Sequence, residues 1–158
     1  MAPLKALADE VIDTTLLTAH ELRRLLALHY GEASTQLTIS LVSFAYRLGL
    51  PREADLVFDV RFLRNPHWVA DLRDLTGHDD AVGAHVAGDP LFQPFFSQTS
   101  ALLLSLFEAY RTEGKSYLTI AVGCTGGRHR SVYVIEKLAA VMQDAGWRVT
   151  IAHRDLKA

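Results

Sequence analysis

The stretch "YLTIAVGCTGGRHRSVYVIEKLAAVM" (residues 117–142) decides the fold class, because it contains a strand, a loop and a helix in succession. Residues 117–122 have the apolar character of a buried strand. Apolar residues then recur at the spacing of one helix face, in a pattern that ends at Gly146: Ile135, Leu138, Ala139 and Met142. The glycine-rich loop 123–131 therefore connects the end of a strand to the beginning of a helix.

Three other segments predict strands. "QLTISLVSFAY" (36–46) and "WRVTIAH" (147–153) are rich in β-forming residues, and "DLVFDVRFL" (55–63) is so apolar that we expect burial on both faces of a sheet. Asp59 and Arg61 share one face of that strand, because side chains two residues apart point the same way. The alternation of strands with helices predicts an α/β fold, a single domain with a mainly parallel sheet of about four strands flanked by helices.

The remaining helices are indicated by their start and stop signals. Residues 18–21 form a capping box that predicts a helix ending at Gly31. The polar segment 64–98 has no long periodic element, which is typical of functional loops and short helices. Within it we expect a short helix near residues 80–87 and a second helix that begins at Asp89–Pro90, with the aspartate as N-cap.

The loop 123–131 is suited to binding an anion. The first N–H groups of a helix have no intrahelical partner, and the helix dipole favours negative charge at that end. Close backbone approach and positive φ angles are expected at three glycines: Gly123, Gly126 and Gly127. Positive or titratable charge comes from three neighbours: Arg128, His129 and Arg130. Ser131 can cap the helix or bind the anion. The loop matches neither a Walker A motif nor GxGxxG, and a simple tight turn is the alternative.

Cys124 raises an enzymatic alternative. Cys124, Arg130 and the following Ser131 have the C-x5-R-S spacing of cysteine-dependent phosphatases, in which a thiolate attacks phosphorus held by the arginine. Asp59 is the candidate general acid for such a reaction. Against this hypothesis, Gly123 stands where those enzymes usually have histidine, and the interior glycines are placed differently. Cys124 as a small residue lining the loop is the simpler interpretation.

Composition narrows the possible functions. The chain has 158 residues, 49% of them hydrophobic, and a net charge of −2. Proteins that bind nucleic acid nonspecifically are usually basic, so overall charge does not support that role. Two interpretations of seven arginines stay open, a local basic patch and scattered charges that keep the protein soluble: Arg47, Arg52, Arg61, Arg64, Arg128, Arg130 and Arg154. The absence of a long apolar run and of a secretory signal, together with a single cysteine, predicts a cytoplasmic protein without membrane contact.

We expect neither a metal site nor a cofactor. Three histidines show no metal-ligand spacing with the lone cysteine: His78, His85 and His153.

Several motifs resemble the carboxy-terminal domain of the RapZ/YvcJ family. They are "LVSFAYRLGLPREAD" (41–55), "LVFDVRFLRNPHW" (56–68), "LTG" (75–77) and "EGKSYLTIAVGCTGGRHRSVYV" (113–134). "ADEVIDTTLLTAHELR" (8–23) is similar to the linker before that domain, so we expect a lead segment over residues 1–17 and the ligand-binding domain over 18–158. The P-loop ATPase domain of full-length members has no counterpart here, so nucleotide binding is not carried over; an isolated domain and a natural short protein are both open.

The resemblance implies a sensor and adapter rather than an enzyme, with no catalytic residue. The family's domain binds glucosamine-6-phosphate, an amino-sugar phosphate of cell-envelope synthesis, and some members are linked to UDP-N-acetylglucosamine instead. Carried over residue by residue, the ligand-binding positions are Asp59, Arg61, His67, Cys124, Thr125, Gly126, Gly127, Arg128, His129, Arg130 and Ser131.

The resemblance also implies macromolecular partners. In enteric bacteria this domain binds small regulatory RNAs and presents one of them to RNase E, and family members self-associate, so a small RNA, an endoribonuclease and a homo-oligomer are expected. RNA-binding members end in a dense cluster of lysine and arginine. This chain ends "HRDLKA", which leaves Arg154 and Lys157 as the expected RNA contacts. Fewer phosphate contacts mean weaker RNA affinity.

Overall fold

The computed structural model describes residues 37–156 continuously and isolated positions before them: 8, 11–15, 17, 21, 22, 25, 26 and 29. The chain divides into two compact units, Met1–Thr35 and Gln36–Ala158. In the first unit the described residues between Glu21 and His29 are helical, as predicted, while the capping Thr18 and the terminating Gly31 lie outside the described residues. The expected roles of residues 1–17 and 18–158 stay predictions.

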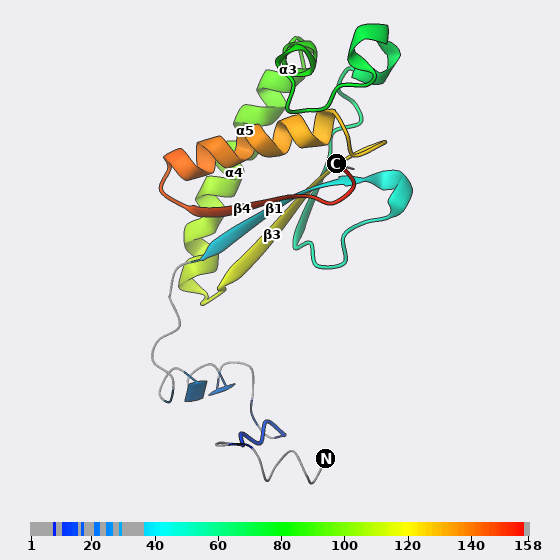
Figure 1. Cartoon of the computed structure of the whole chain (residues 1–158). Helices are drawn as coiled ribbons and strands as arrows, with labels where there is room; N and C mark the ends of the chain where they lie inside the picture. The colour runs from blue at the N-terminus through cyan, green and yellow to red at the C-terminus, as the bar shows by residue number, and fades with distance from the viewer. Residues whose placement is uncertain are drawn as a thin grey trace. The chain divides into compact units, whose positions relative to one another are not determined.

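The second unit is built on a parallel sheet of four strands (Figure 1): β1 (Thr38–Ala45), β2 (Leu56–Asp59), β3 (Tyr117–Cys124) and β4 (Arg148–His153). Their order in the sheet is β2-β3-β1-β4, and every neighbouring pair is parallel. Because parallel strands need crossover connections, helices join β2 to β3 and β3 to β4. The predicted α/β class and strand number are confirmed.

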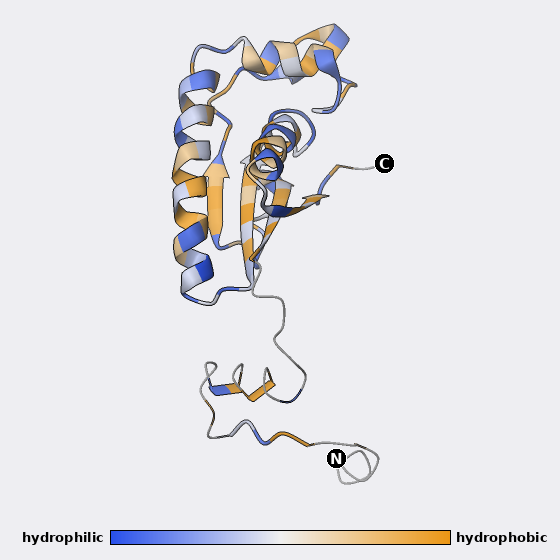
Figure 2. Cartoon of the chain, turned by 90° about the vertical axis from the view of Figure 1, so that its left-hand side faces the viewer, coloured by the Kyte–Doolittle hydropathy of each residue, from blue (hydrophilic) through white to orange (hydrophobic). Residues whose placement is uncertain are grey.

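Three α-helices occur between residues 37 and 156: α3 (Asp80–Ala87), α4 (Phe92–Thr112) and α5 (Arg130–Asp144). Figure 2 shows largely apolar strands beside helices that carry both polar and apolar residues. The buried core is formed by residues of α4 and α5 together with alternate residues of the strands, whose side chains point to one face of the sheet. It includes Leu103, Phe107, Ile135, Leu138, Ile39, Leu41, Leu118, Ile120 and Val122. Among the described residues, no helix combines the length and the apolar character that crossing a membrane requires.

Strand β2 is shorter and more exposed than predicted. It ends at Asp59, and Val57 keeps 41% of its surface exposed, because β2 is an edge strand of the sheet. The expectation of burial on both faces is therefore wrong. The chain turns after Val60, whose amide donates a last hydrogen bond to the Gly123 carbonyl oxygen at 2.9 Å.

The segment 64–98 contains the short helix that the sequence predicts, since α3 spans the same residues, Asp80–Ala87. Helix α4 begins at Phe92 rather than directly after Asp89. The Asp89 carboxylate accepts hydrogen bonds from the amides of Leu91, at 2.9 Å, and Arg64, at 2.7 Å. Asp89 therefore stabilises a turn before α4 and fastens it to the loop after β2, instead of capping the helix.

The carboxyl ends of the strands lie along one edge of the sheet. Ala45 pairs with Cys124, and Asp59 pairs with Gly123. In parallel sheets this edge is where ligands bind. The glycine-rich loop after β3 leaves the sheet at that edge.

Candidate functional site

A pocket of about 520 Å³ opens beside the glycine-rich loop. Half of its lining comes from the loop itself: Cys124, Thr125, Gly126, Arg128, His129 and Arg130. The other half comes from segments that follow β1 and β2: Arg47, Asn65, His67, Trp68, Arg73 and Asp74. Four arginines face one aspartate, so the pocket is positively charged and suited to an anion. We call it the arginine pocket.

Two glycines are required by the local geometry. Gly127 has φ +67°, and a Cβ atom there would lie 3.0 Å from the Ala45 amide nitrogen and 3.1 Å from Asp155 Cβ. At Gly123 a Cβ atom would lie 2.4 Å from the Phe44 ring. Gly126 has no positive φ, and a Cβ atom there would meet nothing within 4 Å. The predicted close approach is thus found at Gly123 and Gly127 and not at Gly126.

Helix α5 begins at Arg130, with His129 in the capping position, so Ser131 is not the cap. Ser131 is fully buried, and its Oγ lies 3.1 Å from the Sγ of Cys124. Cys124 is 2% exposed. The two side chains form a small polar contact beneath the loop, on the pocket side of β3.

Arg130 is buried and connects three parts of the site. Its Nη1 donates to the carbonyl oxygens of Arg61, at 2.7 Å, and Leu63, at 3.0 Å, and its Nη2 donates to Thr125 Oγ1 at 3.2 Å. Its Nε is buried and has no hydrogen-bond partner among the described residues. Burial lowers the pKa of Arg130 from its ordinary value, and nearby Cys124 and Asp59 oppose that change. Arginine stays charged at neutral pH all the same.

Arg128 and His129, which precede Arg130 in the sequence, hold the segment 73–75 in place. Arg128 donates from Nε to the Leu75 carbonyl oxygen at 2.8 Å and from Nη2 to that of Asp74. His129 Nε2 donates to the Arg73 carbonyl oxygen at 3.2 Å, since a carbonyl can only accept. Burial, together with the Arg128 charge, lowers the pKa of His129, which is therefore neutral at pH 7.

Asp59 and Arg61 are paired with each other and do not line the arginine pocket. The Asp59 carboxylate accepts two hydrogen bonds from Arg61 Nε and one of 2.6 Å from Nη2, and the guanidinium stacks 3.9 Å from the centre of the Tyr46 ring. The hydrogen bonds from Arg61 outweigh desolvation and lower the pKa of Asp59. The structure therefore places His67 in the pocket lining with the predicted loop residues, whereas this pair lies outside the lining and meets the loop through the Arg61 carbonyl oxygen, which accepts from Arg130.

Five lining residues escaped the sequence analysis as ligand positions: Arg47, Asn65, Trp68, Arg73 and Asp74. Arg47 and Asn65 come shortly after the ends of β1 and β2, and their place at the carboxyl edge is the signal that could have identified them. Trp68 is 78% exposed, and its ring meets that of His67 edge to face. An exposed indole at the mouth of a pocket is a surface on which a ligand ring can stack.

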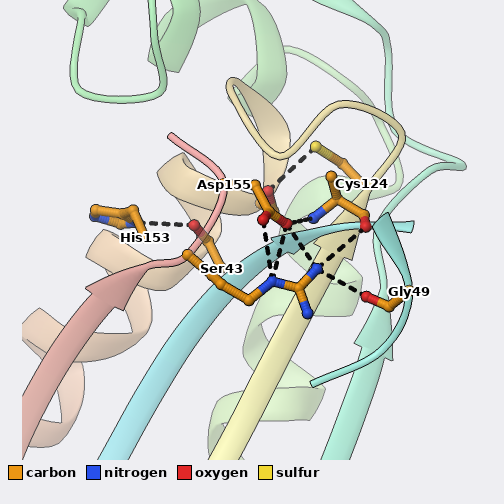
Figure 3. Close-up of polar contacts among 8 residues, drawn as sticks. Ser43, Gly49, Cys124, His153 and Asp155 are labelled. Carbon is orange, nitrogen blue, oxygen red and sulfur yellow. Dashed lines mark hydrogen bonds and ion pairs between the residues drawn. The ribbon is translucent and has the colours of Figure 1, made fainter. Parts of the chain in front are cut away.

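Arg154 is held by the domain itself (Figure 3). It forms a 2.7 Å ion pair with Asp155, and its Nη2 also donates to the Gly49 carbonyl oxygen at 2.8 Å. Its role in RNA binding stays a prediction, and Lys157 lies outside the described residues.

These features define an α/β domain with a cationic pocket at the junction of a parallel strand, a glycine-rich loop and a helix N-terminus. A family model described as the RapZ C-terminal domain matches residues 37–157. The chain belongs to this family.

Curated relatives support the assignment. The chain is 56% identical over 157 residues to a nucleotide-binding protein of Paramagnetospirillum magneticum, covering 99% of this chain and 51% of that protein. It is 50% identical to a nucleotide-binding protein of Rhizorhabdus wittichii (99% and 50%) and 53% identical to one of Rhodospirillum centenum (99% and 47%). The chain spans about half the length of these relatives.

Proposed function

We propose that this domain is a sensor that binds an amino-sugar phosphate, glucosamine-6-phosphate, and acts as a regulatory adapter. The observation that carries the proposal is Arg130, whose buried Nε has no hydrogen-bond partner within residues 37–156, in a pocket with three further arginines. A buried polar atom without a partner costs free energy, so a ligand oxygen that accepts from it is favoured. The N-terminus of α5 adds N–H groups and a favourable dipole for a phosphate.

The amino group requires an acid, and Asp74 is the acid that lines the arginine pocket. Asp59 is less suited, because its carboxylate already accepts from Arg61. We therefore propose that the ammonium group of the ligand forms an ion pair with Asp74. A volume of about 520 Å³ is within the range of small-molecule sites, and the exposed Trp68 offers a surface for the sugar ring.

Calorimetric titration with glucosamine-6-phosphate tests the proposal. We expect binding by the wild type and at least about a tenfold loss for Arg130→Ala, because a charge-assisted contact disappears from a buried site. Arg52→Ala is the matched control, since Arg52 is exposed and outside the pocket lining. UDP-N-acetylglucosamine is titrated in parallel as the alternative ligand. No heat and no thermal shift at millimolar sugar phosphate, with the fold intact, would reject the proposal.

The adapter part of the proposal is that a small structured RNA binds at the rim of the same pocket and is presented to an endoribonuclease. Arg47 and Arg73 are exposed there and available to RNA phosphates. The sugar phosphate should then weaken RNA binding, and RNA should weaken sugar-phosphate binding by the same factor. Gel shifts with and without the ligand measure this. If no RNA is shifted even at low salt, only the sensor part survives.

Self-association is a further expectation from family membership. Size-exclusion chromatography with light scattering on the samples used for titration tests it. A monomer at every concentration rules it out.

A phosphatase is the second candidate, favoured by the 3.1 Å contact of Cys124 Sγ with Ser131 Oγ and by the position of Arg130. Two observations weaken it. Cys124 is 2% exposed, and Asp59, the candidate general acid, has a lowered pKa that keeps it ionised. An aryl phosphate assay with Cys124→Ser as control decides between the two functions, because turnover that this change abolishes would identify an enzyme.

A further inference from the structure

Three potential metal ligands from separate parts of the chain converge beside α5. We propose that His78, Glu136 and His153 bind a divalent transition-metal ion, with zinc as the best fit. His78 precedes α3, Glu136 lies on α5, and His153 is the last residue of β4. One ligand atom from each lies within 4.8 Å of the other two.

Two of the three separations are close to those of a small tetrahedral ion, and the third, at most 4.8 Å, would have to shorten on binding. His153 Nε2 is 2.9 Å and His78 Nδ1 is 3.8 Å from Glu136 Oε1. Zinc bonds of about 2.0–2.1 Å in a tetrahedron hold neighbouring ligand atoms about 3.3 Å apart, which lies between these two distances. Two imidazoles and a carboxylate are a common zinc ligand set, and three protein ligands leave one position for water.

The surroundings of His153 match those of a metal-ligating histidine. Its Nδ1 is 2.8 Å from the Oγ of Ser43, the residue paired with it on the adjacent strand β1 (Figure 3). A metal on Nε2 requires the proton on Nδ1, and the Ser43 hydroxyl can accept it. Such a second hydrogen bond fixes the tautomer and the ring orientation of metal ligands.

The backbone at His78 is held in position by its neighbours. Gly77 is buried, and its amide donates to the Arg128 carbonyl oxygen at 2.9 Å. A Cβ atom at Gly77 would lie 2.4 Å from the His129 carbonyl oxygen, so this backbone packs tightly against the start of α5. The His78 amide donates to Thr76 Oγ1 at 3.2 Å. Two ligands are thus attached to rigid elements, and the third to a fixed turn.

Other interpretations explain less of this arrangement. Ser43, His153 and Glu136 are connected in the order of a Ser–His–Glu nucleophile triad, but Ser43 is fully buried and cannot reach a substrate. A plain hydrogen-bonded pair accounts for His153 and Glu136 alone. An edge-to-face contact of the His78 and His153 rings, with centroids 4.9 Å apart, places His78 beside the pair but does not account for a nitrogen 3.8 Å from the same carboxylate oxygen, which is longer than a hydrogen bond.

The cluster is separate from the arginine pocket. A hollow of about 370 Å³ beside it is lined by His78 and Glu136 and by two further acids, Asp79 and Asp80, and it shares no lining residue with that pocket. Its three acidic residues outnumber its one lysine, Lys137, which favours the approach of a cation. A bound ion would join β4, α5 and the turn whose Gly77 amide bonds to the glycine-rich loop. The proposal therefore stands independently of the sugar-phosphate function.

The test is titration of untagged, chelator-treated protein with zinc, followed by calorimetry and thermal unfolding, and with cobalt(II), whose visible absorption reports coordination geometry. We expect one ion per chain, a rise in the unfolding temperature and a tetrahedral cobalt spectrum. Glu136→Gln and His78→Ala should each weaken zinc binding about tenfold or more, and Ser43→Ala by about tenfold through ligand orientation. His85→Ala is the matched control, since this histidine on α3 lies outside the cluster.

Two results would overturn the proposal. One is a wild-type protein that binds no zinc at micromolar concentrations while circular dichroism shows it folded. The other is zinc binding that persists in both Glu136→Gln and His78→Ala, because the ion would then lie elsewhere. Loss of zinc only in Cys124→Ser is one form of this second result. Glu136→Gln preserves the side-chain shape, and circular dichroism of that variant checks that a lost signal does not come from misfolding.

Discussion

The backbone amide of Ala45 donates a 2.6 Å hydrogen bond to the carboxylate of Asp155, which fastens the residues after β4 to the end of β1. Arg154 holds the same carboxylate through its Nε and Nη2. The Asp155 Cβ atom also lies where any side chain at Gly127 would have to go. The segment after the last strand therefore supports the glycine-rich loop from beneath.

Asp155→Ala should lower the free energy of unfolding by about 1–3 kcal/mol, because the amide of Ala45 loses a charged acceptor in a part-buried position. Urea denaturation followed by circular dichroism measures the change. Asp144→Ala is the control, since Asp144 is exposed at the end of α5. Equal stability of the two variants would show that the Asp155 contact adds nothing.

Gly127→Ala should be destabilising and should also weaken the sugar phosphate. The residue has φ +67°, and the new methyl group would lie 3.0–3.1 Å from atoms of Ala45 and Asp155, closer than ordinary van der Waals contact. Strain of this kind costs about 1–3 kcal/mol. Gly126→Ala is a matched control one residue away, with open space and no positive φ. A similar loss in both variants would mean that loop flexibility, and not the left-handed backbone at Gly127, is what matters.

The parts of the fold that the sequence predicts well are those specified by local patterns. The strand that leads into the glycine-rich loop is a continuous apolar run, the helix with Ile135 and Leu138 has strong periodicity, and the short helix predicted near residues 80–87 coincides with α3. The sequence pattern extends β2 to residue 63, whereas the strand ends at Asp59, because Phe62 continues the apolar pattern after the chain has left the sheet. Periodicity does not reveal that a strand lies at an edge.

The site was only partly predictable because its contacts are long-range. Arg130 lies in a recognisable loop, but its donation to the carbonyls of Arg61 and Leu63 depends on how two loops meet. The family resemblance predicts Asp59 as a ligand position, whereas the structure pairs its carboxylate with Arg61. The cluster around Glu136 joins residues up to 75 positions apart, which no local spacing rule detects.

His129 should make the domain less stable as the pH falls below about 6.5. Burial lowers its pKa in the folded state, whereas the unfolded chain has the ordinary value of about 6.5. Between these two values the unfolded state binds more protons, so the free energy of unfolding falls with pH until the lowered pKa is passed. His129→Asn should show a smaller decrease between pH 7.5 and 5.5 in urea denaturation. An identical decrease in wild type and variant would mean that other groups carry the effect.

The final prediction concerns selectivity for the amino group, measured as the ratio of dissociation constants for glucose-6-phosphate and glucosamine-6-phosphate. If the ammonium pairs with Asp74 in the arginine pocket, Asp74→Asn should reduce this ratio about threefold to fivefold, as expected for a solvent-exposed ion pair. Asp59→Asn is the matched comparison, because its carboxylate is held by Arg61 and does not line the pocket. That variant should leave the ratio unchanged, even where both affinities fall together. A reduced ratio in Asp59→Asn with an unchanged ratio in Asp74→Asn would place the ammonium at the end of β2 and require Arg61 to release its partner on binding.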